Sequence, residues 1–154
     1  MDLTIRPAVI DDADAIAAVF SPSIRSLDFL PDLHTPAEDR WFIEHVILAE
    51  CAVSVAAEGA RIHGFLAQQG TEIRLLYVHP ERIGRGIGSR LIETVRNTGA
   101  ERLELWCFQA NWNARRFYER HGFVAVEFTD GRNNEEKTPD MRYVWTRPIA
   151  KPQA

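Results

Sequence analysis

The sequence predicts one domain of mixed α/β class, with about seven strands and about four helices. Some segments alternate apolar and polar residues, as strands do. Between them lie segments whose apolar residues recur at helical spacing. Three extended segments in the middle of the chain are separated by single glycine turns, which favours an antiparallel meander. A strand, a glycine-rich loop, a helix and a further strand then follow one another. This order predicts a parallel pair of strands joined by a right-handed crossover.

The chain is expected to begin with a strand and a helix. Residues 3–6 alternate between apolar and polar side chains and are followed by Pro7, so they predict a short strand. Asp11 can cap the helix that follows, because apolar residues recur at helical spacing from Ile16 onward. Pro22 is expected to end this helix or to begin a second one, since proline fits the first helical turn.

A second helix and the meander are expected next. Thr35 and Glu38 have the spacing of a capping box, and a proline follows Thr35, so a helix should run to about Ala49. The turns at Gly59 and Gly70 separate three extended segments. These strands are expected over residues 52–57, 62–68 and 72–78.

The second half of the chain predicts two helices and three further strands. The helices are expected over residues 86–97 and 111–121, and the strands over 103–108, 123–129 and 141–146. The first of these strands follows a strand–helix passage, so it should lie parallel to the strand before the glycine loop. We expect one domain over residues 1–148, with residues 149–154 as a tail.

Composition and charge narrow the class of protein. Apolar residues make up 45% and charged residues 26% of the chain, which is typical of a globular protein. The net charge of −4 argues against a nucleic-acid binder. The N-terminus does not resemble a signal peptide and no apolar run could cross a bilayer, so we expect a cytoplasmic protein without membrane contact. Cys51 and Cys107 lack metal-ligand spacing, so we expect buried, reduced thiols and no metal.

Three glycines at alternate positions, Gly84, Gly86 and Gly88, separate a strand from a helix. They predict an anion-binding loop, because glycine adopts positive φ and lets the backbone approach a ligand closely. The helix that follows directs its unpaired N–H groups and the positive end of its dipole at the loop. A tight turn would explain the glycines alone, but the strand before them and the helix after them favour a phosphate or pyrophosphate site.

Two common nucleotide motifs fit this loop poorly. A P-loop requires a lysine, and none occurs here. A dinucleotide fingerprint requires Ser89 in place of the last glycine and Glu104 as the ribose ligand. Glu104 lies inside a predicted strand, and too little chain follows for a doubly wound sheet. A dinucleotide-binding domain therefore remains only a lesser alternative.

A second motif indicates which anionic ligand the glycine loop would bind. Residues 111–123 read N-x-x-A-x-x-F-Y-x-x-x-G-F, and residues 76–91 read L-Y-V-x-P-x-x-x-G-x-G-x-G-S-x-L. In this order and separation, the pair resembles the GNAT superfamily of N-acetyltransferases. The resemblance implies a central sheet that splays apart between its two parallel strands. It also implies acetyl-CoA as the cosubstrate, bound in the cleft between those strands.

The resemblance implies the contacts of this cosubstrate residue by residue. The pantetheine arm would run as an added strand along the backbone of Leu76, Tyr77 and Val78. The pyrophosphate would lie on the N–H groups of Gly84, Arg85, Gly86, Ile87, Gly88 and Ser89. Ile83 stands where the family usually has arginine or glutamine, so Arg82 and Arg85 would supply the charge. Asn111 would contact the pantetheine or a water, and it can also cap its own helix.

Catalytic roles follow from the same resemblance. Tyr118 would protonate the departing thiolate of CoA, which suits a phenol because its ordinary pKa near 10 keeps it protonated at neutral pH. The alternative for Tyr118 is a packed aromatic side chain. Glu72 would take the proton from the acceptor ammonium, with His79 or a chain of waters as alternatives. The N–H group of Val78 would hold the developing oxyanion.

The acceptor would be a primary amine of a small molecule or peptide, which the sequence does not identify. The carboxylates of the loop 130–140 could attract a cationic amine, or this loop is a solvated hairpin tip. These carboxylates are Asp130, Glu135 and Glu136. Residues 27–34, with Trp41, would form the other wall of the acceptor pocket or belong to the ordinary core. Two possibilities stay open: a silent acyl-CoA-binding domain on the same fold, and a homodimer paired through the apolar strand 141–145.

Overall fold

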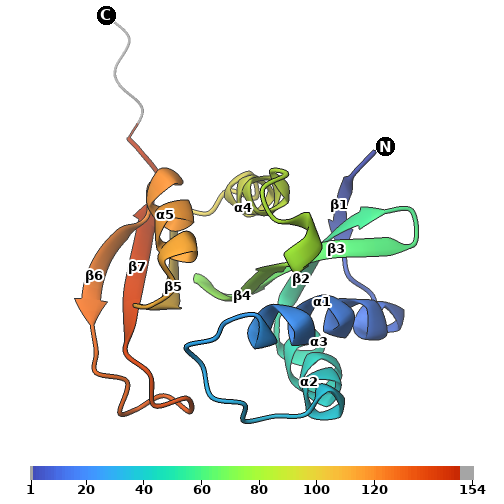
Figure 1. The fold of residues 1–154 in the computed structure, drawn as a ribbon. Helices are drawn as coiled ribbons and strands as arrows, with labels where there is room; N and C mark the ends of the chain where they lie inside the picture. The colour runs from blue at the N-terminus through green and yellow to red at the C-terminus, as the bar shows by residue number, and fades with distance from the viewer. Residues whose placement is uncertain (1, 150–154) are drawn as a thin grey trace, which may run out of the picture.

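The computed structural model describes residues 2–149 and contains the predicted mixed sheet (Figure 1). Seven strands lie in the order β1-β2-β3-β4-β5-β7-β6. Neighbouring strands are antiparallel except β4 and β5, which are parallel as expected. The strands are β1 (Thr4–Pro7), β2 (Ala52–Glu58), β3 (Arg61–Gln69), β4 (Glu72–Val78), β5 (Arg102–Phe108), β6 (Val124–Phe128) and β7 (Asp140–Thr146).

Helices cover both faces of this sheet. They are α1 (Ala13–Arg25), α2 (Pro36–Phe42), α3 (Leu48–Glu50), α4 (Ile87–Arg96) and α5 (Trp112–Arg120), with short turns η1 (Ile10–Asp12), η2 (Ile43–Ile47) and η3 (Pro80–Arg82). Figure 1 shows α1, α2 and α3 on one side of the sheet and α4 on the other. The segment α2–η2–α3 is continuous, so the predicted second helix is confirmed, with a π turn in its middle. Its capping box is also confirmed, since the Thr35 hydroxyl accepts the Glu38 N–H at 3.1 Å.

The first helix differs from the expectation at both ends. Pro22 lies inside α1 rather than at a boundary, because proline has a helical φ and loses only one backbone bond there. The face of α1 that packs on the sheet holds the helix together past this point. Asp11 does not cap α1, because the chain first makes the turn η1. Asp12 closes that turn by accepting the Val9 N–H at 2.8 Å.

The core has one cluster on each side of the sheet. Ile16, Ile43 and Phe65 belong to the cluster between α1, η2 and strands β2 and β3. The other cluster joins α4 and α5 to β5 and β7. Cys107 is buried there, and burial raises the pKa of its thiol to about 12. Cys51 is only half-buried, so the expectation of two buried thiols is wrong for this residue.

Within residues 2–149, no helix has the length and apolar character that crossing a bilayer would require.

Strand β7 lies between β5 and β6, with antiparallel partners on both sides. The strand 141–145 therefore has no free edge for pairing across a dimer. On this side of the sheet the edge strand is β6.

The parallel pair separates almost at once. Strand β5 meets β4 only at Glu72 and Glu104 in the described part of the chain, near the start of both strands. Beyond this point the strands diverge, and Figure 1 shows the gap between β4 and β5. The splay that the sequence motifs implied is therefore present, and it leaves one side of β4 without a neighbouring strand.

Candidate functional site

The gap between β4 and β5 opens into a cavity of about 580 Å³, which we call the splay cleft. The end of β4, the glycine loop, the start of α4 and one face of α5 line it. Most of the residues implied for the cosubstrate lie here. They are Leu76, Tyr77, Val78, Arg82, Gly84, Gly86, Ile87, Gly88, Ser89 and Asn111. Arg85 is exposed and does not line the cleft.

Backbone groups of β4 face the splay cleft because of the pairing with β3. The His79 N–H donates to the His63 carbonyl at 2.8 Å, so the odd-numbered residues at this end of β4 bond to β3. Backbone groups alternate in direction along an antiparallel strand, so those of Leu76 and Val78 point away from β3. They point toward the gap, where β5 has already diverged. This side of β4 has no neighbouring strand, and of its backbone groups the Val78 carbonyl accepts the Ser23 hydroxyl at 3.2 Å. It can accept an extended ligand as an added strand.

The glycine loop places the start of α4 at the same cleft. Gly84 and Gly86 have φ values of +85° and +78°, which confirms that the turn needs glycine. Gly86 is the N-cap of α4 in the left-handed conformation. Gly88 has a different role, since a Cβ atom there would lie 3.1 Å from the Phe117 ring. It lets α4 and α5 approach closely, while the N–H groups of the first helical turn stay unpaired.

Positive charge reaches the cleft from two elements. Arg82 comes from η3, while Arg116 and Arg120 come from the exposed face of α5. Sequence reasoning missed the two α5 arginines, although their i, i+4 spacing places them on one helical face. The Ser89 hydroxyl, next to the N–H groups implied for the pyrophosphate, lies 2.9 Å from the Nε2 atom of His121.

Tyr118 lies in the wall of the cleft and is 9% exposed. Its ring packs against Phe123 and Tyr143, at centroid distances of 5.6 and 5.9 Å. Burial, and then the nearby Cys107 and Tyr77, raise the pKa of the Tyr118 phenol above its ordinary value. The phenol therefore remains protonated throughout the neutral range. Tyr118 is both a packed aromatic side chain and a protonated group in the cleft. Asn111 likewise lines the cleft and caps α5, accepting the Ala114 N–H at 3.2 Å.

The two candidate bases lie outside the cavities. Glu72 is the strand-register partner of Glu104, where β4 and β5 are still adjacent, and it lines neither cavity. A strand rises about 3.3 Å per residue, so Glu72 lies roughly 20 Å along β4 from Val78. His79 also lines neither cavity, and its Nδ1 atom accepts the Glu81 N–H at 3.2 Å. The structure does not bring either residue together with Tyr118.

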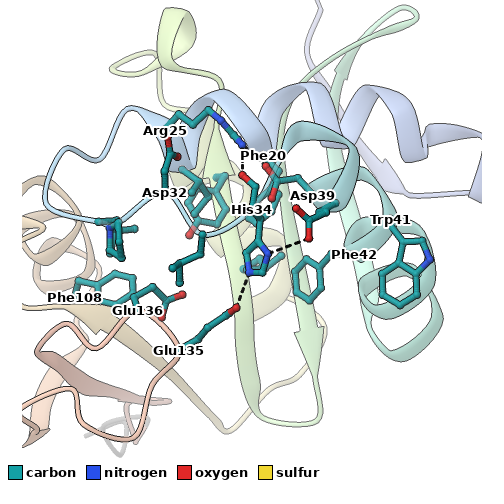
Figure 2. Close-up of a pocket in the computed structure, with 17 residues that line it drawn as sticks. Phe20, Arg25, Asp32, His34, Asp39, Trp41, Phe42, Phe108, Glu135 and Glu136 are labelled. Atoms are coloured by element: carbon teal, nitrogen blue, oxygen red, sulfur yellow. Dashed lines mark hydrogen bonds and ion pairs between the residues drawn. The ribbon is translucent and has the colours of Figure 1, made fainter.

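A second cavity of about 640 Å³ lies on the α1 and α2 side of β4, and we call it the loop cavity. It is lined by residues 30–34 and Trp41, and by Glu135 and Glu136 from the opposite loop (Figure 2). Both stretches suggested for an acceptor pocket therefore meet at one cavity. Tyr77 lines the loop cavity and the splay cleft, so the two adjoin at β4. Asp130 does not line the loop cavity and instead pairs with Arg132 at 2.7 Å.

An ion pair joins the two loops that line the loop cavity. The Nε2 atom of His34 lies 2.6 Å from the Glu135 carboxylate (Figure 2), and its Nδ1 atom lies 3.8 Å from that of Glu38. Glu135, followed by Glu38, raises the pKa of His34 above its ordinary value. Because the charged imidazole is the form that is stabilised, this contact is present at low pH. It is lost as the pH rises through the raised pKa.

We therefore expect the His34 imidazole to titrate above its ordinary value of about 6.5. Glu135→Gln should lower this pKa more than Glu38→Gln does, since Glu135 is the nearer partner. An NMR pH titration of the imidazole nitrogens measures all three proteins. A wild-type value at or below 6.5, or no change in Glu135→Gln, would contradict the ion pair.

Comparisons with known proteins identify the family. Residues 43–125 match the model of the acetyltransferase (GNAT) domain. An uncharacterized N-acetyltransferase of Archaeoglobus fulgidus is 30% identical over 131 residues, covering 75% of this chain and 89% of that protein. One of Methanocaldococcus jannaschii is 28% identical over 150 residues, or 83% of this chain, which spans only 63% of that longer protein.

Solved structures agree on the fold. A GCN5-related N-acetyltransferase from Rhodopseudomonas palustris superposes with a TM-score of 0.76 at 23% identity, covering 96% of this chain and 97% of that one. PaiA N-acetyltransferase from Thermoplasma acidophilum, solved in complex with coenzyme A, gives a TM-score of 0.71 at 18% identity, covering 96% and 100%. With the domain match and the archaeal relatives, they lead to one conclusion: the chain belongs to the GNAT superfamily of N-acetyltransferases, and is an acyltransferase.

Proposed function

We propose that this acyltransferase transfers the acetyl group of acetyl-CoA directly to a primary amine in a ternary complex. The observation that carries the proposal is the side of β4 that has no neighbouring strand, which runs into the glycine-capped start of α4. An extended arm that ends in a pyrophosphate matches this combination of a free strand side and a helix N-terminus.

The residues of the splay cleft suit the parts of acetyl-CoA. Backbone groups of Leu76 and Val78 would hold the pantetheine arm. The N–H groups at the start of α4, with Arg82, Arg116 and Arg120, would hold the phosphates, because both charge and helix dipole favour an anion there. The three arginines compensate for Ile83, which is 68% exposed and carries no charge.

The cosubstrate would supply an activated thioester, and the chain would supply an oxyanion donor and a proton donor. The Val78 N–H is directed into the gap and would donate to the oxyanion that develops on the carbonyl. Tyr118 would hold the proton that passes to the departing sulfur. The acceptor, entering through the loop cavity, would lose its proton to water there. We assign no direct proton transfer to Glu72 or His79, since neither lines a cavity.

Ligand binding and turnover test this proposal together. Acetyl-CoA should raise the melting temperature of the protein, whereas NAD should not. Release of CoA, followed with a thiol reagent, should exceed the amine-free rate for at least one member of a panel of primary amines. Stabilisation by acetyl-CoA without turnover on any amine would favour a silent acyl-CoA-binding domain. Stabilisation by NAD alone would favour a dinucleotide site.

A further inference from the structure

The walls of the loop cavity are mainly apolar. Aromatic and aliphatic side chains from α1, the loop before α2, α2, β4 and β5 face it. They include Phe20, Ile24, Leu33, Phe42, Leu75 and Phe108. A cavity of about 640 Å³ is of the size that holds a small organic molecule, and walls of this kind favour an apolar body. The acceptor therefore gains binding free energy from the apolar surface that it buries here.

The charges around the same cavity are predominantly negative. Five carboxylates line it, against one guanidinium and one imidazole. The guanidinium of Arg25 is already paired with buried Asp39 at 2.7 Å, which also accepts the Ser21 hydroxyl at 2.8 Å. The imidazole of His34 is paired with Glu135 at 2.6 Å. Both cations of the lining are therefore engaged by carboxylates of the protein.

Two of the carboxylates have no such partner. Among residues 2–149, the side chains of Asp32 and Glu136 make no ion pair or hydrogen bond with another residue. Glu136 lines the loop cavity together with Tyr77, the β4 residue that both cavities share. Burial and then the charge of Glu136 raise the pKa of Tyr77. An unpaired negative charge thus lines the cavity that adjoins the splay cleft at Tyr77. It favours an arriving ammonium and opposes an arriving carboxylate.

We propose, building on the function above, that the acceptor is a primary amine with an apolar body and without a carboxylate group. The apolar body packs between the walls that α1, α2 and β4 provide. The ammonium approaches past Glu136 toward Tyr77 and loses its proton before it attacks. Amino acids, and other amines that carry a carboxylate, are disfavoured because neither cation of the lining is free to pair with that carboxylate.

A homologous series of amines tests the apolar part of this inference. Steady-state rates are measured with propylamine to octylamine at saturating acetyl-CoA. The value of kcat/KM should rise about two- to fourfold for each methylene that becomes buried. Titration calorimetry of the same amines into the protein with CoA should give the same trend in Kd, whether or not turnover occurs. A series without any dependence on chain length would overturn the proposal.

A matched pair of amines tests the charge. Hexylamine and 6-aminohexanoate differ in a terminal carboxylate, and the second should be poorer by about tenfold or more in both kcat/KM and Kd. Glu136→Gln and Asp32→Asn should each reduce this preference about two- to fivefold. Glu101→Gln, which removes a carboxylate outside both cavities, is the control and should not change it.

The outcomes separate this inference from the proposed function. Equal binding of hexylamine and 6-aminohexanoate would overturn the inference. If CoA is nevertheless released with other amines, the acetyltransferase function stands. Absence of turnover on every amine would contradict the function, while the calorimetric series still decides whether the loop cavity selects apolar cations.

Discussion

Replacing Tyr118 with phenylalanine should lower kcat at neutral pH by about 100-fold or more, because positioned proton donors contribute at least this factor. The ring stays in place among Phe123 and Tyr143, so folding and the Kd for acetyl-CoA should change little. The rate of CoA release, followed with a thiol reagent, gives kcat, and titration calorimetry gives the Kd for acetyl-CoA. The proton-donor role fails if Tyr118→Phe turns over at the wild-type rate.

Tyr143→Phe is the matched control for this substitution. It removes a phenol hydroxyl that donates to Glu119 at 2.6 Å, from a side chain that lines neither cavity. It should cost about 1–2 kcal/mol of stability and leave kcat within about twofold. An equal loss of kcat in both variants would assign the effect to packing rather than to the proton of Tyr118.

The pH dependence of the wild-type enzyme provides a further check. Below its pKa the phenol carries the proton that it donates, and burial raises the pKa of Tyr118 above its ordinary value. Loss of that proton should therefore not reduce kcat below about pH 10. A fall in kcat that begins near neutral pH and is absent from Tyr118→Phe would contradict this assignment.

The second large effect is expected at the glycine loop. Gly86→Ala should weaken acetyl-CoA binding by about tenfold, because an L-residue at a φ of +78° costs about 1–2 kcal/mol. Relief of this strain would turn the first N–H groups of α4 away from the splay cleft. No atom of residues 2–149 lies within 4 Å of the added methyl group, so packing does not contribute.

Gly59→Ala separates strain from binding. Gly59 also has a positive φ of +59° with open space around it, but it lies in the turn between β2 and β3. Both variants should lose similar stability on thermal unfolding, and only Gly86→Ala should change the Kd for acetyl-CoA. If Gly86→Ala folds and binds acetyl-CoA as tightly as wild type does, the loop does not form the anion site.

The sequence predicted the elements of this fold well because their signals are local. Strand β4 has the predicted bounds, and α4 and α5 begin and end within one or two residues of the expected positions. Two predictions about the first helix were wrong, one because packing overrode a local preference and one because a short turn precedes the helix. Pro22 continues α1 because the helix is held on the sheet, and Asp11 lies in a turn that the spacing of apolar residues did not reveal.

Some features of the candidate site could be predicted from the sequence and others could not. The glycine loop and the N-cap Asn111 could be predicted, since a short segment specifies each of them. The position of Glu72 could not, because a motif gives its distance along the strand but not the point at which β5 diverges. The arginines of α5 were within reach of a helical-face argument, whereas the ion pair between His34 and Glu135 joins residues 101 positions apart.

By itself, the sequence determined the mixed sheet, the parallel crossover and the glycine loop that caps α4, because periodicity, turn residues and helix caps act over a few neighbouring positions. Only the tertiary structure decided the shape and charge of the loop cavity. Its walls come from α1, the loop before α2, α2 itself, β4, the end of β5 and the loop before β7, which meet only after the chain has folded. Which charges are already paired there depends on distances between these segments, and no local pattern records those distances.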